Sequence, residues 1–233
     1  MDHEKPIIYV KNVRKVYRMG DEEVAALKRI NLRIYKGEVC CIFGTSGSGK
    51  STLLNQLAGM EKPTKGQVFI RGKNISDMNE EELAAFRQEH MSFIFQSYNL
   101  LPSMTAVENV AMPLMFKGMD RKKREAMAEE MLKRVGLSHR LHHYPSQMSG
   151  GQQQRAGIAR AFVSRPEVVF ADEPTGNLDT KTTAEIMDMV MGFARRFNQT
   201  IILVTHDPGM SRYADRIVTL VDGIITGDER KGQ

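Results

Sequence analysis

Short apolar runs recur along the chain, and helical patterns fill the intervals between them. The runs are rich in branched and aromatic residues and too short for helices, which indicates strands. Several are apolar without alternation, which is typical of a mainly parallel sheet covered by helices on both faces. We therefore predict an α/β fold. The expected strands are Ile7–Val10, Val39–Phe43, Val68–Ile70, Ser92–Phe95, Val168–Ala171, Ile201–Thr205 and Ile217–Leu220.

The expected helices lie between these strands, and they dominate the middle of the chain. Strand patterns stop between Ser97 and about Arg155. We therefore predict a single domain over residues 1–233, in which a helical subdomain at 97–155 is inserted into an α/β core formed by 1–96 and 156–233. The polar tail Gly227–Gln233 is expected to be loose. The helical patterns cover Lys50–Ala58, Glu80–Glu89, Thr105–Lys117, Arg121–Val135, Gly150–Ser164 and Lys181–Phe197.

Length and composition indicate a self-sufficient globular chain. With 233 residues, 41% of them hydrophobic, it can bury a full core without disulfides or metals. Cys40 and Cys41 are neighbours on an expected strand and point to opposite faces, so we interpret them as small buried hydrophobes. No apolar stretch approaches the roughly 20 residues that span a bilayer. The charged start, Met1–Pro6, has neither a secretory nor a lipidation signal, so we expect a cytosolic location.

The chain is basic, with a net charge of +5 and an isoelectric point near 9.2. This balance is compatible with binding to nucleic acid or to an anionic membrane. Acidic residues are interspersed with the basic ones, however, and the run Arg121–Arg124 is followed by Glu125, Glu129 and Glu130. We favour a solvated helix face and expect no nucleic-acid partner.

Three histidines, His139, His142 and His143, raise the alternative of a metal site. Their neighbours Arg140 and Tyr144 supply no further metal ligand. We therefore interpret this cluster as a surface turn.

A glycine-rich segment follows the expected strand Val39–Phe43 and leads into an expected helix, which is the context of a phosphate-binding loop. Glycines let the backbone curl so that N–H groups point at phosphate oxygens, and the helix N-terminus adds partial positive charge. Lys50 is expected to reach the β- and γ-phosphates, and the Ser51 hydroxyl to ligate Mg²⁺. The candidate phosphate-binding residues are Gly44, Thr45, Ser46, Gly47, Ser48, Gly49, Lys50, Ser51 and Thr52.

The apolar strand Val168–Ala171 ends in two acids, Asp172 and Glu173. A buried carboxylate is costly unless a cation neutralises it, and Mg²⁺ at the phosphate loop would do so. Asp172 is therefore predicted to be a metal ligand. Glu173 is turned differently and is predicted to polarise the water that attacks the γ-phosphate. The alternative for this pair is an ordinary helix-capping turn.

A second anion-binding helix start is predicted at Ser149, Gly150, Gly151 and Gln152, which the first phosphate site does not need. One chain thus carries half of two sites. With this motif the sequence resembles the ATP-binding subunits of ABC transporters, with Met148 in place of the usual leucine, a swap that keeps volume and apolarity.

The resemblance implies a P-loop NTPase core of RecA type with a mainly parallel sheet, an N-terminal antiparallel β part and an inserted α-helical subdomain. It implies a head-to-tail homodimer that hydrolyses ATP with Mg²⁺, in which Ser149 and Gly151 act on the ATP held by the other copy. It also assigns four further residues: Tyr17 stacks on adenine, Gln96 joins the Mg²⁺ shell to the helical lobe, Asp179 lies in the loop that crosses the dimer, and His206 touches the γ-phosphate.

A narrower resemblance is carried by Phe170–Asp179 and Phe95–Pro102, which are similar to the branch of macrolide exporters, lipoprotein-releasing ATPases and the cell-division ATPase FtsE. It implies a transmembrane permease partner, a position on the inner face of the membrane, and export or extraction of a peptide, lipoprotein or drug-like substrate. An FtsE-like mechanical regulator without transport is the alternative. A soluble member acting on DNA or ribosomes is disfavoured, because the chain has neither a long coiled coil nor a second cassette.

In that branch the surface after Gln96 receives a short helix of the membrane partner. Met112, Met115 and Met119 lie nearby at helical spacing, and methionines suit an adaptable docking groove. The interpretation we favour is that they form the core of the lobe. Pro113 is expected to interrupt their helix.

Overall fold

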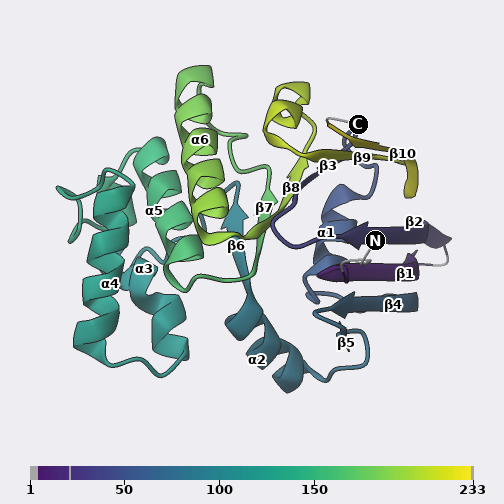
Figure 1. The fold of residues 1–233 in the computed structure, drawn as a ribbon, viewed down its shortest axis with the longest axis horizontal. Helices are drawn as coiled ribbons and strands as arrows, with labels where there is room; N and C mark the ends of the chain where they lie inside the picture. The colour runs from purple at the N-terminus through teal and green to yellow at the C-terminus, as the bar shows by residue number, and fades with distance from the viewer. Residues whose placement is uncertain (1–4, 21, 232–233) are drawn as a thin grey trace. The chain divides into compact units, whose positions relative to one another are not determined.

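The computed structural model describes residues 5–20 and 22–231, which form two compact units (Figure 1). The first unit combines Met1–Arg87 with Thr200–Gln233, and the second is Gln88–Gln199. The second unit contains the helical segment 97–155 that the sequence predicts, together with the strands that flank it. The subdivision at 97 and 155 remains a prediction.

The first unit contains an antiparallel sheet with the strand order β2-β1-β4-β5 (Figure 1). Ile8 lies opposite Ile34 of one neighbouring strand and Ile70 of the other, and all three side chains are buried. The sequence predicted only short parts of this sheet, because β2 carries many charged residues and because bulges shift its register with β1. The bounds are β1 Ile8–Met19, β2 Glu22–Ile34, β4 Lys65–Ile70 and β5 Lys73–Asn74.

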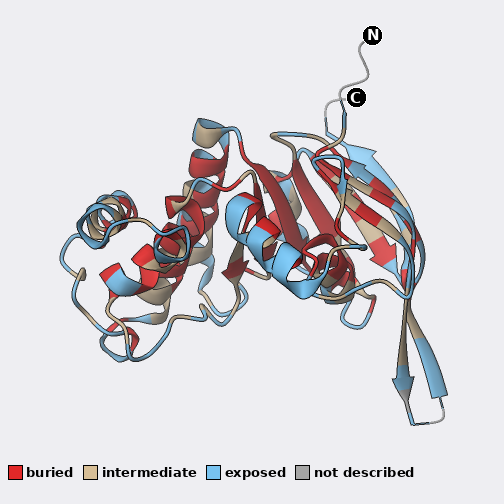
Figure 2. Cartoon of the chain, turned by 90° about the horizontal axis from the view of Figure 1, so that it is seen from below, coloured by how far each residue is buried: buried red, intermediate tan, exposed pale blue. Residues whose placement is uncertain are grey.

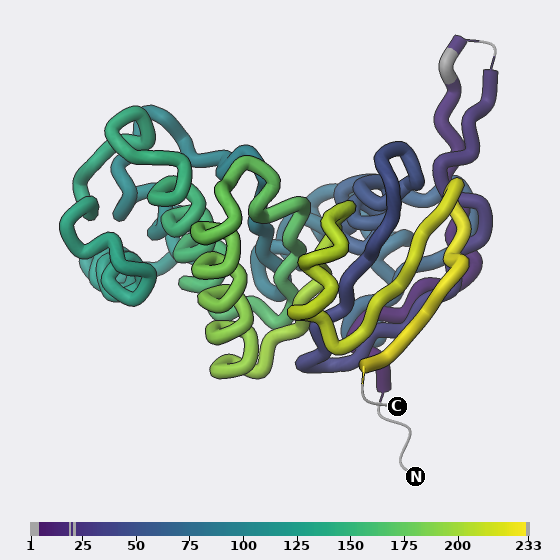
Figure 3. The backbone as a smooth tube through the Cα atoms, turned by 90° about the horizontal axis from the view of Figure 1, so that it is seen from above, coloured from purple at the N-terminus to yellow at the C-terminus, as the bar shows by residue number. Residues whose placement is uncertain are grey.

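The paired ends of the two longest strands, β1 and β2, leave the sheet as an exposed two-stranded ribbon (Figures 2 and 3). Tyr17 pairs with Val24, which is 45% exposed, and Arg18 pairs with Glu23. Polar side chains on both strands account for this exposure. Tyr17 therefore lies where the covered sheet gives way to the solvated ribbon.

The first unit also contains a parallel set of strands, in which β8 and β9 flank β3 (Figure 1). β3 and β8 are buried almost throughout, as their unbroken apolar runs predicted. Cys40 and Cys41 are fully buried and free, which confirms their interpretation as small hydrophobes. Burial raises the pKa of both thiols, to about 11 for Cys41. The bounds are β3 Val39–Phe43, β8 Thr200–Thr205 and β9 Arg216–Val221.

The expectation of a loose tail at Gly227–Gln233 is wrong for its first four residues. Strand β10, Ile224–Arg230, pairs antiparallel with β9 and includes Gly227–Arg230. The strand is polar because it lies at the edge and exposes most of its side chains. Gly232 and Gln233 lie outside the described residues.

The helices of the second unit follow the predicted order, and its two strands pair in parallel. A capping box between Thr105 and Glu108 starts α3, which continues through Pro113, so the expected interruption is wrong. The bounds in this unit are β6 Met91–Phe95, α3 Ala106–Phe116, α4 Arg121–Arg134, η1 Pro145–Gln147, α5 Gly150–Val163, β7 Val168–Asp172 and α6 Thr180–Phe197. The remaining helical elements are α1 Lys50–Leu57, α2 Glu80–His90 and η2 Pro208–Tyr213.

Three surface features of the second unit bear on the sequence predictions. Arg121–Arg124 lies on the solvated first turn of α4, as predicted. His139 and His142 are exposed in a turn, which confirms the surface interpretation of the histidine cluster. Met115 is 40% exposed, so the lobe-core interpretation is wrong for this methionine.

Within residues 5–20 and 22–231, the helices are too short or too polar to span a bilayer.

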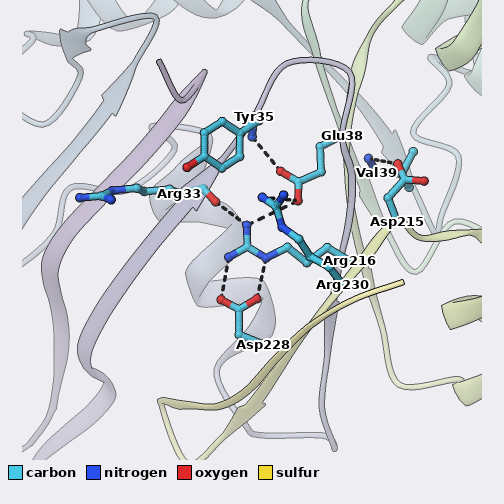
Figure 4. A network of polar contacts seen from close by, with 8 residues as sticks. All are labelled: Arg33, Tyr35, Glu38, Val39, Asp215, Arg216, Asp228 and Arg230. Atoms are coloured by element: carbon cyan, nitrogen blue, oxygen red, sulfur yellow. Dashed lines mark hydrogen bonds and ion pairs between the residues drawn. The ribbon is translucent and has the colours of Figure 1, made fainter. Parts of the chain in front are cut away.

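A buried arginine joins three strands of the first unit, β9, β10 and β2, and the turn before β3 (Figure 4). Arg216 of β9 donates to both carboxylate oxygens of Asp228, at 2.5 and 2.6 Å, to the backbone oxygen of Arg33 at 2.6 Å, and to Glu38 at 3.4 Å. Only 7% of Arg216 is exposed. The hydrogen bonds with Asp228 raise the pKa of the guanidinium, so the cation is held at every accessible pH.

We expect Arg216→Met to destabilise the chain by about 3 kcal/mol, because it removes both hydrogen bonds to Asp228 and the ion pair with Glu38 from a largely buried position. Urea unfolding followed by circular dichroism measures the loss. The matched control is Arg18→Met, whose exposed pair with Glu23 at 3.2 Å should contribute under about 1 kcal/mol. Equal effects of the two substitutions would contradict a structural role for the Arg216 network.

Candidate functional site

The phosphate loop lies between β3 and α1, with Gly49 as the residue that starts the helix. Gly49 has a φ of 100°, and a Cβ there would lie 2.6 Å from the backbone oxygen of Ala26. Only glycine fits this backbone approach. The N-terminus of α1 can therefore present its free N–H groups to a ligand.

Lys50 is buried at the first position of α1, and its Nζ donates to the backbone oxygen of Thr45 at 2.8 Å. The lysine thus bends back over the loop and spans it. Ser51 follows and is exposed, whereas Ser48 is buried with a hydroxyl that has no hydrogen-bond partner in the described part of the chain. A loop that combines the Lys50 ammonium group, free N–H groups and an unsatisfied hydroxyl suits a polyphosphate.

His206 belongs to the same edge of the first unit as the phosphate loop. Phe43, the last residue of β3, lies opposite Thr205, the last residue of β8. Gly44 and His206 therefore follow directly from paired strand ends. His206 is exposed there, as a residue that contacts a ligand must be.

Tyr17 is half-buried on β1, and its hydroxyl donates to Glu61 at 2.6 Å. Burial raises the pKa of Tyr17, and the bond to Glu61 adds to this effect. The predicted aromatic is therefore held in place by a carboxylate. The sequence analysis did not single out Glu61.

The second unit repeats the arrangement of paired strand ends. Phe95 of β6 lies opposite Asp172 of β7, so Gln96 and Glu173 follow from neighbouring strands. Glu173 has a φ of 43°, a left-handed conformation that is strained for a residue with a side chain. The chain thus leaves the extended conformation of the strand at Glu173, directly after Asp172.

Gln96 is positioned by the segment after Glu173. Its Nε2 lies 3.5 Å from Oδ1 of Asn177, and Nδ2 of Asn177 donates to the backbone oxygen of Gln96 at 3.2 Å. A Cβ on Gly176 would lie 2.6 Å from Nε2 of Gln96. These contacts join Gln96 to the segment that follows Asp172 and Glu173, and they give Asn177 a positioning role.

The second predicted anion site, Ser149–Gln152, which we call the signature turn, is a capped helix start. The Ser149 hydroxyl accepts from the backbone N–H of Gln152 at 3.4 Å, and Oε1 of Gln152 accepts from the backbone N–H of Ser149 at 3.1 Å. Gly150 and Gly151 occupy the first turn of α5. A Cβ on Gly150 would lie 2.7 Å from the hydroxyl of Tyr98. The helix start is therefore compact and exposes the Ser149 hydroxyl.

Asp179 caps α6. Its carboxylate accepts from the Thr182 hydroxyl at 2.6 Å and from the backbone N–H groups of Lys181 and Thr182 at 3.1 and 3.0 Å. These bonds, first the one from the Thr182 hydroxyl, lower the pKa of Asp179. A methyl of Thr182 in turn lies 3.2 Å from the position of a Cβ on Gly151. The signature turn and the Asp179 loop are thus neighbours within the second unit.

Arg160 of α5 is a positioning residue that the sequence analysis missed. It is buried and donates to the backbone oxygens of Tyr98 and Asn99, at 2.8 and 2.5 Å. Both acceptor residues are left-handed, with φ of 59° and 49°. Burial lowers the pKa of Arg160. The available signal was a lone arginine within an otherwise apolar helical stretch.

Residues 27–176 match the family described as ABC transporter. The uncharacterized ABC transporter ATP-binding protein MJ1508 of Methanocaldococcus jannaschii is 48% identical over 219 residues, which cover 94% of this chain and 97% of that protein. The macrolide export ATP-binding/permease protein MacB of Shewanella sp. strain ANA-3 is 47% identical over 225 residues, which cover 97% of this chain and 34% of that protein. The chain therefore spans about a third of the length of MacB.

Among solved structures, a dimeric post-hydrolysis state of the ATP-binding cassette MJ0796, bound to ADP and Pi, has a TM-score of 0.90 and 42% identity. The match covers 96% of this chain and 98% of that one. This likeness confirms the predicted P-loop NTPase fold with its antiparallel and mostly parallel parts. Matched in sequence and fold over nearly its whole length, the chain belongs to the ABC transporter family, as an ATP-hydrolysing cassette.

Proposed function

We propose that two copies of this chain bind two ATP molecules head to tail, each between the phosphate loop of one copy and the signature turn of the other. The observation that carries the proposal is that one chain builds two helix starts suited to anions, at Gly49 and at Ser149. In the proposed dimer, each ATP molecule contacts one helix start of each kind, the Gly49 start of one copy and the Ser149 start of the other. The dimeric MJ0796 structures support self-association of such cassettes.

Within this proposal the phosphate loop, Gly44–Thr52, holds the phosphates, and Lys50 exchanges the Thr45 oxygen for phosphate oxygens. Oxygen donors of the kind that Mg²⁺ prefers are supplied by the Ser51 hydroxyl, the Gln96 side-chain amide and the Asp172 carboxylate. When bound, Mg²⁺ would neutralise charge on the transferred phosphoryl group. Gly150, Gly151 and Gln152 complete the signature turn beside Ser149.

Hydrolysis depends on positioning and on charge rather than on a covalent intermediate. Glu173 accepts a hydrogen bond from the attacking water and polarises it, and His206 orients the γ-phosphate. The left-handed backbone at Glu173 supports this role, because strained conformations concentrate at functional sites. Asp179 acts at the dimer interface through the loop that it stabilises by capping α6.

We expect Glu173→Gln to bind ATP normally, to form a longer-lived dimer and to hydrolyse ATP at least about 100-fold more slowly, because the amide cannot polarise water as the carboxylate does. Phosphate release measures turnover, and gel filtration with ATP measures dimerisation. Near-normal turnover of this variant would remove Glu173 from its role.

Sharing of the sites is tested with two inactive variants. Lys50→Met removes the phosphate-loop cation, and Ser149→Asp keeps a helix-capping side chain but places a negative charge against the γ-phosphate. Each alone is expected to be inactive. Mixed dimers contain one intact site, made of Lys50 from one copy and Ser149 from the other, so the mixture should hydrolyse ATP faster than either variant.

The matched control is Ser149→Asn, which caps the helix without adding charge and should retain more activity than Ser149→Asp. A mixture of Lys50→Met and Ser149→Asp that stays as inactive as its components would show that the sites are not shared. Full activity of either variant as a monomer would do the same.

The proposed partner is a transmembrane permease, with the chain bound at the cytoplasmic face of the membrane. The sequence likeness to MacB, a protein named for both ATP binding and permease activity, supports this assignment. A groove of about 190 Å³ between α3 and α4 is lined by Met104, Met112 and Met115, with Glu108 and Arg124 at its sides. Flexible methionines suit the docking of a helix from the permease.

The proposed output is export or extraction of a peptide, lipoprotein or drug-like substrate. Reconstitution of the chain with its permease in vesicles tests this output. ATP-dependent movement of a substrate across the vesicle membrane supports export. Hydrolysis that changes the permease conformation without any transport supports the FtsE-like mechanical regulator instead.

A further inference from the structure

Glu61 and Lys15 contact Tyr17 directly, and Asn55 in turn contacts Glu61. Besides the bond from Tyr17 to Oε2 of Glu61, the Nζ of Lys15 lies 3.2 Å from the same oxygen and 5.1 Å from the centroid of the Tyr17 ring. Asn55 of α1 donates to the other carboxylate oxygen, Oε1, at 3.0 Å. Lys15 also donates to the backbone oxygen of Lys62 at 2.9 Å. Both oxygens of Glu61 are therefore engaged.

The contacts around Tyr17 are partly shielded from solvent, and this shielding strengthens their electrostatic attraction. The side chains of Lys15 and Glu61 are 17% and 31% exposed, respectively. Hydrogen bonds to an ionised group are stronger than those between neutral groups. The pKa of Glu61 is raised by burial, but the bonds from Tyr17, Asn55 and Lys15 outweigh this and lower it overall. Glu61 is thus ionised at neutral pH.

The contacts also relate the ring to the phosphate loop. Asn55 belongs to α1, the helix that starts at the loop, so Glu61 ties the hydroxyl end of the ring to that helix. Thr52, one of the loop residues, acts on the same hydroxyl and lowers its pKa. The distance between the aromatic ring and the phosphate loop is therefore set by side-chain bonds, although Tyr17 itself stands at the base of a solvated ribbon.

We infer that Lys15 and Glu61 are positioning residues, which together hold the Tyr17 ring as a platform for the nucleotide base at a fixed distance from the phosphate loop. The inference rests on the proposed role of Tyr17 in stacking. Lys15 occupies one face of the ring and leaves the other to the base. Because the Glu61 oxygens are already engaged, the cluster supports stacking and does not read the base edge, so ATP and GTP should respond alike to its loss.

The test compares ATP with inorganic tripolyphosphate, which has the phosphates but no base. Glu61→Met removes both acceptor oxygens at similar side-chain length, and Tyr17→Phe keeps the ring but removes its tether. Each is expected to weaken ATP binding about fivefold, in line with one lost hydrogen bond, and to leave tripolyphosphate binding unchanged. The double variant should lose no more than about what either single one loses, because both break the same contact. Isothermal titration calorimetry gives the affinities.

Glu23→Met is the matched control. Glu23 lies on the same ribbon and pairs with Arg18, but both side chains are exposed, so its substitution should change neither affinity. If Glu61→Met does not fold, Tyr17→Phe carries the test alone, because it removes a single oxygen atom.

Tyr17→Ala separates the inference from the proposed function. If Tyr17→Ala leaves ATP affinity unchanged, the stacking role itself fails. If Tyr17→Ala weakens ATP binding while Tyr17→Phe and Glu61→Met leave it intact, the stacking role stands and the positioning inference is overturned. Equal loss of ATP and tripolyphosphate in Glu61→Met also overturns it, because the cluster would then act on the phosphate loop rather than on the base.

Discussion

Parallel pairing of β3 with β8 places Phe43 opposite Thr205, and the chain leaves both strands at one edge to form the phosphate loop and to reach His206. Pairing of β6 with β7 does the same for Gln96 and Glu173. Side chains at such an edge are fixed by buried strands yet reach solvent, because the strands end there. The proposed chemistry of this cassette depends on that constraint, because strand ends position these side chains more firmly than loops alone would.

Local signals were enough to predict the elements that carry their own pattern. The unbroken apolar run of β3 and the glycines after it predicted the strand, the loop and α1 together. Strands β2 and β10 were missed entirely, because charged edge strands lack that pattern and are held by pairing with neighbouring strands. Glu61 and Arg160 were missed for a related reason. Their partners lie 44 and 62 positions away, at Tyr17 and Tyr98, and only the folded chain brings them together.

The two helix starts of the proposed composite site are built differently, and the difference has a consequence for binding. Gly49 leaves the N–H groups of α1 free, so the phosphate loop can bind without breaking an internal cap. Ser149 already caps α5 with its hydroxyl. A phosphate at the signature turn must therefore share or replace that bond, which makes it the weaker of the two half-sites. This difference implies an order of events at the proposed composite site. ATP binds first to the phosphate loop, and the second copy then closes over it.

Helix α5 is the element that connects the loops of the second unit. Its buried side chains donate to backbone oxygens in two of them: Arg160 to Tyr98 and Asn99, and Gln154 to Pro174. Tyr98 and Asn99 follow shortly after Gln96 along the chain, and Pro174 directly follows Glu173. Because a buried donor that loses its acceptor costs free energy, α5 cannot shift without carrying both loops with it. In the proposed dimer, closure of a second copy on Ser149, at the start of this helix, would therefore act on Gln96, the proposed Mg²⁺ ligand, and on Glu173, the proposed water-polarising carboxylate, through the same rigid element.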